Sequence, residues 1–137
     1  MERTTSLSRP NMHEIRKVEP ARPLTPTERR LLDFLLRKPF PGRNDLKAQL
    51  GSVGVATECR ICPTVELTVD RSSARAAPVR SRIPVEAEGV DVDGKRLHVL
   101  LHVVDGFLSE LEVFREDGEP VRDLVGTESF ELVHYES

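Results

Sequence analysis

Hydrophobic and polar residues alternate most regularly in the segment LHVLLHVVDGFLSELEV, Leu97–Val113. Successive side chains of a β-strand point to opposite faces, so this pattern predicts two strands joined by a tight turn at Asp105-Gly106. The hydrophobic positions of the first strand are expected to share the face that packs in the core: Leu97, Val99, Leu101 and Val103.

Two registers are compatible with this hairpin. A two-residue turn would set Glu110 opposite Leu101 and mix charged with apolar side chains on one face. A three-residue loop pairs Val103 with Phe107 and separates a mostly apolar face from a polar one. We therefore expect the three-residue loop, with Gly106 at a positive φ.

A helical pattern precedes the strands. Thr25 and Glu28 form a capping-box motif, and a broad apolar stripe follows at residues 31–36. Asn44 can cap a short second helix that stops at Gly51. The link between the two helices is short, which predicts a helical hairpin.

Further strands are indicated at residues 55–61, 65–69, 84–92 and 130–135. Together with the hairpin they predict an α+β fold, in which the helical hairpin packs on an antiparallel sheet of about five to six strands. Residues 1–22 have scattered charge and no sustained periodicity, so we expect a disordered basic arm, followed by a single α+β domain at 23–137.

Charge is unevenly distributed along the chain. Residues 1–43 carry ten Lys or Arg and five Asp or Glu, whereas residues 44–137 carry ten and eighteen. No apolar run is long enough to cross a bilayer and no signal-peptide pattern begins the chain, so we expect a cytoplasmic protein. Two helices before strands also begin a winged helix, but no third, basic helix is indicated after them, which argues against nucleic-acid binding.

Cys59 and Cys62 form the single C-x-x-C motif. Such a pair can supply two of the four ligands of a zinc ion, and His98 and His102 could supply the others. Strands flank the motif, whereas a redox motif is typical of a helix N-terminus. The alternative is a pair of partly buried thiols without metal.

His98, His102, Glu110 and Glu112 are expected on the polar face of the hairpin. A histidine beside a carboxylate can act as a general acid or base, although no nucleophile is adjacent in the sequence. Cross-strand His–Glu pairs also simply stabilise sheets.

The second half of the hairpin is strongly acidic. We expect Glu110, Glu112, Glu116 and Asp117, with His98 and His102 beside them, to bind a basic surface of another protein. The leading hypothesis is therefore a non-enzymatic protein-binding module, immunity-like or regulatory. The alternatives are a zinc-binding module at Cys59 and Cys62, a nucleic-acid-binding protein, or an enzyme that uses His98 and His102 with Glu110 and Glu112.

Three segments carry a resemblance to known sequences. LTPTERRLLDFLL at 24–36, PTVELTVD at 63–70 and VVDGFLSELEVFREDGEPV at 103–121 resemble small uncharacterised bacterial proteins of unknown function. The resemblance covers residues 24–135 and implies no activity. In its general form, a small acidic α+β domain, the chain is also similar to immunity proteins of bacterial toxin systems.

Overall fold

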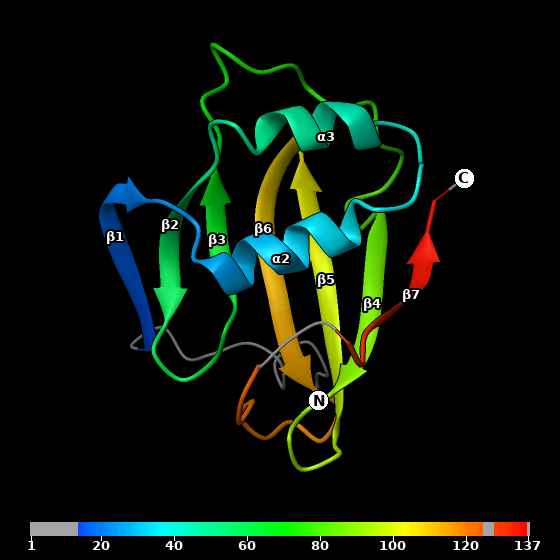
Figure 1. Cartoon of the computed structure of the whole chain (residues 1–137). Coiled ribbons are helices and arrows are strands. Elements are labelled where there is room, and N and C mark those ends of the chain that lie inside the picture. Colours follow the sequence, from blue (N-terminus) through cyan, green and yellow to red (C-terminus); the bar gives the residue numbers. More distant parts are fainter. Residues whose placement is uncertain (1–13, 125–127, 137) are drawn as a thin grey trace, which may run out of the picture.

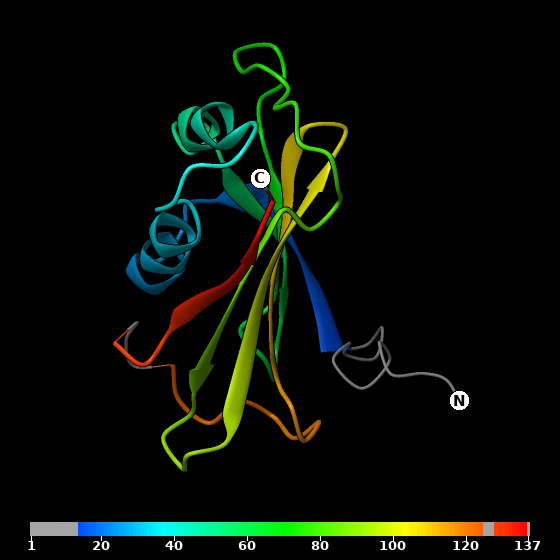
Figure 2. The ribbon, with the colours of Figure 1, turned by 90° about the vertical axis from the view of Figure 1, so that its right-hand side faces the viewer.

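Seven strands form one antiparallel sheet in the computed structural model, which describes residues 14–124 and 128–136. Their order across the sheet is β1-β2-β3-β6-β5-β4-β7, and two helices cover one face (Figures 1 and 2). The elements are β1 (Ile15–Arg22), α2 (Pro26–Leu35), α3 (Arg43–Gln49), β2 (Gly54–Cys59), β3 (Val65–Thr68), β4 (Val85–Val90), β5 (Arg96–Val104), β6 (Phe107–Arg115) and β7 (Glu131–Tyr135). Neither of these helices has the length and hydrophobicity that a bilayer span requires.

The antiparallel sheet is confirmed, but it is larger than the sequence predicted. The additional strand is β1, which lies within the segment expected to be a disordered arm. It pairs with β2 at the sheet edge, and of its eight residues only Val18 and Arg22 are partly buried. An edge strand with so little burial needs no hydrophobic alternation, so no local pattern predicts it. The rest of the predicted arm, residues 1–13, lies outside the described residues.

Helix α2 begins as its sequence predicts. Thr25 Oγ1 accepts the backbone N–H of Glu28 at 3.1 Å, and Glu28 Oε1 accepts the N–H of Thr25 at 2.8 Å. The predicted cap of the second helix is wrong, because the N-cap residue of α3 is Gly42 at φ +90° and not Asn44. The predicted helical hairpin is not confirmed either. Helix α2 lies against β4 and α3 lies against β6, so each packs on the sheet.

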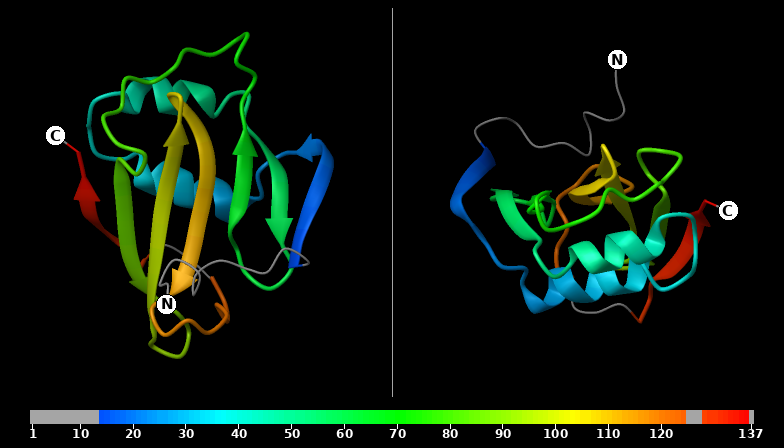
Figure 3. Two further views of the ribbon diagram at one scale, coloured as in Figure 1. Left: turned by 180° about the vertical axis from the view of Figure 1, so that it is seen from behind. Right: turned by 90° about the horizontal axis from the view of Figure 1, so that it is seen from above.

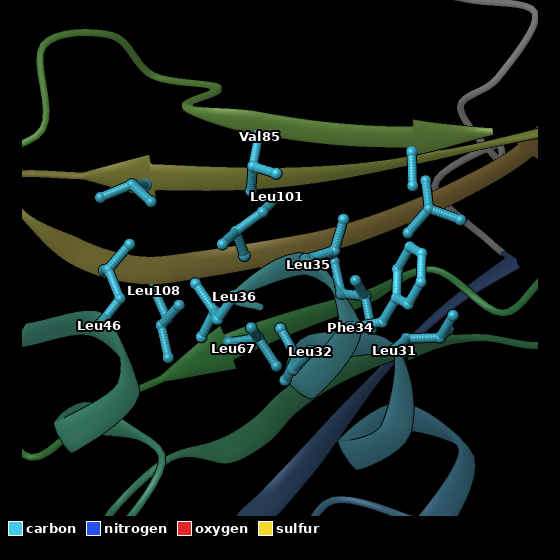
Figure 4. Close-up of a cluster of buried hydrophobic side chains, with 14 of the residues drawn as sticks. Leu31, Leu32, Phe34, Leu35, Leu36, Leu46, Leu67, Val85, Leu101 and Leu108 are labelled. Atoms are coloured by element: carbon cyan, nitrogen blue, oxygen red, sulfur yellow. The ribbon is translucent and has the colours of Figure 1, made fainter. Parts of the chain in front are cut away.

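The core lies between the helices and the sheet. Figure 4 shows Leu35 of α2 near Leu101 of the sheet, and Leu32 of α2 beside Leu67 of β3. Leu97, Val99 and Leu101 of β5 have no exposed surface and Val103 exposes 4%, so this face is buried as the sequence predicted. Burial of each such side chain contributes about 1.5–3 kcal/mol.

The β5–β6 register corrects the predicted three-residue loop. Val104 pairs with Phe107 across a two-residue turn, and both turn residues have positive φ, 56° at Asp105 and 86° at Gly106. A β-bulge at Ser109 then shifts the register by one residue. Leu101 therefore faces Leu111, and the charged side chains go to the opposite face. Apolar and charged side chains lie on opposite faces as expected, but the bulge produces this separation and the loop length does not.

A buried glutamine attaches α3 to this turn. The Gln49 side chain has no exposed surface; its Nε2 donates to the carbonyls of Arg75 and Gly106 at 2.8 and 2.9 Å. Its Oε1 accepts the N–H of Leu108 at 2.9 Å. All its hydrogen bonds reach backbone groups of other segments, so Gln49 joins the helix layer, the β5–β6 turn and the loop at 71–84.

Substitution Gln49→Leu should strongly destabilise the fold. The Leu108 N–H and the Arg75 carbonyl would lose the glutamine, whereas the Gly106 carbonyl keeps the N–H of Ala77. Two buried backbone groups left without this hydrogen-bond partner, at about 1–3 kcal/mol each, lower the free energy of unfolding by roughly 2–6 kcal/mol. Urea denaturation measures this loss, with the exposed Lys47→Leu of the same helix as a control. Equal midpoints for the two variants would contradict this role of Gln49.

Candidate functional site

The sheet face opposite the helices carries a row of carboxylates and imidazoles. In the register of the strands, Glu66 of β3 lies opposite Glu110 of β6, and Glu110 lies opposite His102 of β5. Figure 3, left, views this face with the helices behind the strands. Two groups have ligand atoms within 4.8 Å of one another: His102, Glu110 and Glu112, and Glu86, Glu88 and His98.

The first group is buried. His102, Glu110 and Glu112 expose 5%, 3% and 5% of their surface. Arg82, in the loop before β4, donates its Nε–H to His102 Nδ1 at 3.1 Å, and His102 Nε2 lies 2.7 Å from Glu112 Oε1. Because arginine only donates, Nδ1 carries no proton, and the ring proton is on Nε2 and points to Glu112. Both ring nitrogens are thus engaged, and neither is open to a substrate.

The second group is half-buried and lies nearer one end of β5. The His98 ring stacks on Phe114, with centroids 5.0 Å apart. Its Nε2 lies 3.0 Å from a carboxylate oxygen of Glu116, and its Nδ1 lies 3.8 Å from one of Glu88. Arg96 bridges the same two carboxylates at 2.9 and 3.4 Å. This arrangement is a cross-strand ion-pair network that holds the Glu116 side chain toward the sheet.

The predicted partner-binding residues therefore occupy two different environments. Glu110, Glu112 and His102 are buried, whereas Glu116 and Asp117 are exposed. Three further residues, Arg82, Glu86 and Glu88, belong to these groups and were not predicted from the sequence. The alternation VEAEGV at 85–90 places both glutamates on the face of the histidines, so it could have identified them; no sequence signal pointed to Arg82.

The C-x-x-C motif lies at the β2–β3 connection, with both thiols half-buried and free. Burial, and then a hydrogen bond with Cys59, raise the pKa of Cys62 to about 11. The thiol therefore stays protonated at neutral pH, unlike a reactive cysteine. Among the described residues no His, Asp or Glu joins the pair in a metal-ligand group, and the two histidines expected to complete a zinc site belong to the groups described above.

A buried arginine organises the end of the sheet where the β4–β5 turn meets the segment after β6. Arg115, with 3% of its side chain exposed, binds Asp117 through two nitrogens at 2.8 and 3.1 Å. It also donates to Asp91 at 3.1 Å and to Asp93 at 3.0 Å. One guanidinium thus holds three carboxylates from two connections, and we call this set the Arg115 network.

The carboxyl of Asp91 fixes the next segment of chain. It accepts the backbone N–H groups of Arg122 at 2.7 Å and Asp123 at 2.9 Å. Burial alone would raise the pKa of Asp91, but these N–H donors outweigh burial and lower it. The Arg115 guanidinium also holds the pKa of Asp117 down, at about 2.

Two connecting regions at opposite ends of the sheet carry opposite charge. At the lower end in Figure 1, residues 116–124 and 128–129 contain five carboxylates and one arginine. At the upper end, the loop at 71–82 contains four arginines and no acid. We call the lower region the acidic end; its exposed carboxylates are Glu116, Asp117, Glu119, Asp123 and Glu128.

A hollow of about 200 Å³ opens at the acidic end. Val90, Val92 and Leu124 supply its apolar wall, and Asp123 and Glu128 lie beside them. Half of the Val90 surface and more than half of the Val92 surface are exposed. An alkyl wall next to carboxylates matches the shape of a lysine or arginine side chain, which has an apolar stem and a cationic end.

Substitution Asp117→Asn should make the protein less stable at neutral pH and flatten its acid unfolding. A carboxyl with a folded pKa of about 2 and an ordinary unfolded pKa of about 3.9 stabilises the fold fully above pH ~4. This contribution falls away as the pH drops through the folded pKa. Urea midpoints measured from pH 7 to pH 2 should therefore change less steeply below pH ~4 in the variant. Glu119→Gln, on the same exposed segment, is the control; identical profiles for wild type and Asp117→Asn would disprove the effect.

Comparison with known proteins gives a family and no activity. Residues 21–125 match the family model described as a domain of unknown function, DUF6984. No curated protein and no solved structure matches the chain. The matched region extends from the end of β1 to the segment after β6 and contains both His/Glu groups and Arg115. Because this region is well over half of the sequence, the chain belongs to the DUF6984 family.

Proposed function

We propose that this protein binds another protein, and that the acidic end receives a basic surface of that partner. The observation that carries the proposal is the hollow beside Val90 and Val92, with Asp123 and Glu128 at its side. A lysine or arginine of the partner would lay its alkyl stem on the valines and direct its cation to the carboxylates.

The Arg115 network supports this assignment because it fixes the acidic end before a partner arrives. Asp91 holds the backbone of Arg122 and Asp123, so the wall of the hollow is attached to the sheet. A preformed site loses less conformational entropy on binding than a mobile one. The exposed Glu116, Asp117 and Glu119 add further negative charge to the acidic end, which speeds encounter with a basic partner.

The proposed contact surface is not the face of β6 that carries Glu110 and Glu112 but the exposed chain that follows this strand. Glu110 and Glu112 are too buried to touch a partner without rearrangement, so the exposed residues that follow them would make the contact. Exposed valines with carboxylates beside them also match the usual pattern of an apolar interface centre next to a polar rim.

The double variant Asp123→Lys/Glu128→Lys should abolish partner binding and leave the fold intact. We would immobilise the full chain, capture proteins from the extract of its host, and measure the purified partner's association rate at rising salt. The expected partner is basic, and its association slows as salt increases because the attraction is screened.

The matched control is Asp33→Lys/Asp45→Lys, which changes the net charge equally on the helix layer. It should capture the same partner as wild type. Capture of that partner by both double variants, or a partner without a basic surface, would refute the proposal. Urea denaturation of each variant separates loss of binding from loss of folding.

A further inference from the structure

The buried group on the sheet contains an imidazole as well as carboxylates, whereas the acidic end offers carboxylates alone. His102 supplies an imidazole, and Glu110 and Glu112 supply carboxylates, with ligand atoms mutually within 4.8 Å. We propose that these three residues bind a divalent transition-metal ion. The site is separate from the hollow at the acidic end, so it can fail without affecting the protein-binding proposal.

The strands hold the three residues in place. His102 and Glu110 are directly paired across β5 and β6, and Glu112 is two residues further on the same face of β6. Metal–nitrogen and metal–oxygen bonds of about 2.0–2.2 Å place the ligand atoms around one ion about 3–4 Å apart. The ligand atoms, now within 4.8 Å of one another, need to move only slightly closer to bind one ion, and the strands hold the backbone of all three residues.

Negative charge at this position favours a cation. Two glutamates lie side by side on β6 at 3% and 5% exposure, and Glu66 lies directly opposite Glu110 on β3. Like charges opposite one another on a sheet repel, and burial strengthens the repulsion between Glu110 and Glu112, whereas Glu66 is exposed. A divalent ion shared by the carboxylates would reduce that repulsion.

The donor set restricts the identity of the ion. One imidazole nitrogen with two carboxylates suits zinc, manganese or ferrous iron, whereas magnesium and calcium prefer oxygen ligands alone. The two thiols at Cys59 and Cys62 belong to another part of the sheet and are not in this group. The ligands are therefore nitrogen and oxygen, without sulfur.

Arg82 and the metal ion would compete for the same imidazole. Arg82 keeps the ring proton on Nε2, because its Nε–H occupies the lone pair of Nδ1. A metal bound at Nε2 needs that proton on Nδ1, where it would meet the donor of Arg82. Metal binding thus requires Arg82 to leave the ring, and this exposed side chain on a loop can do so without disturbing the strands.

Titration calorimetry of the full chain with Zn²⁺, and absorption spectroscopy with Co²⁺, test the site. We expect one ion per chain and no cobalt–thiolate charge-transfer band. Glu110→Gln and His102→Asn should each weaken Zn²⁺ binding by more than the roughly 10–100-fold that loss of an outer-shell partner costs. Absence of Zn²⁺ binding to wild type would overturn the proposal.

Arg82→Ala is the decisive variant, because its residue is exposed and lies outside the strands. It should bind Zn²⁺ several-fold more tightly than wild type, whereas a cluster with only a structural role would not gain affinity. This readout holds even if the His102 variant fails to fold. Unchanged or weaker binding in Arg82→Ala would refute the competition on which the site depends.

Two matched controls locate the ion. His98→Ala, on the same strand and face, and Cys59→Ser/Cys62→Ser should bind Zn²⁺ as wild type does. Loss of the ion in the cysteine variant, together with a thiolate band in the cobalt spectrum, would place the metal at the C-x-x-C motif and overturn the assignment to His102.

Discussion

The pairing of β5 with β6 is the constraint on which the rest of the structure depends. These two strands are the longest in the sheet, and they supply both the central part of the core and the His/Glu group on the opposite face. The bulge at Ser109 determines which side chains of β6 face the core and which face the opposite side of the sheet. If Ser109 were paired like its neighbours and not bulged, the register set by the turn at Asp105 and Gly106 would place Glu110 opposite Leu101, inside the core.

Much of the fold could be predicted because it follows local rules. The capping box of α2, the alternation in β3 and β5 and the positive φ at Gly106 each depend on residues close in the sequence. The register could not be predicted in the same way. A bulge has no signature of its own, and the turn sequence alone is compatible with either loop length.

The candidate site was predictable only in part, for a related reason. Strand alternation placed His102 and Glu112 on one face, which is correct, but burial depends on what covers that face, and alternation does not report it. Arg82 reaches the imidazole from a loop twenty residues earlier, and Arg115 joins two turns that are far apart in the sequence. Contacts of this kind arise from the completed fold and leave no local pattern.

The Arg115 network and Gln49 have the same structural role at the two ends of the sheet, because each attaches connecting segments to one another. At each end, one buried polar side chain binds backbone or carboxylate groups from segments that the strands do not connect. The two ends nevertheless have opposite surface charge, because the exposed residues around these anchors differ. The buried hydrogen bonds that hold each end together therefore do not depend on the surface charge of that end.

Strand β1 has a consequence for the boundary of the domain. The family model begins at residue 21, near the end of β1, yet β1 covers the outer edge of β2 and Arg16 pairs with Glu58 there. A chain shortened to the matched region would leave the backbone N–H and carbonyl groups of β2 without their neighbour. Such an open edge is a template for pairing with another molecule. With β1 present the edge is this strand instead, and Pro20 together with the exposed charges of Arg16 and Lys17 makes it a poorer template for pairing than β2.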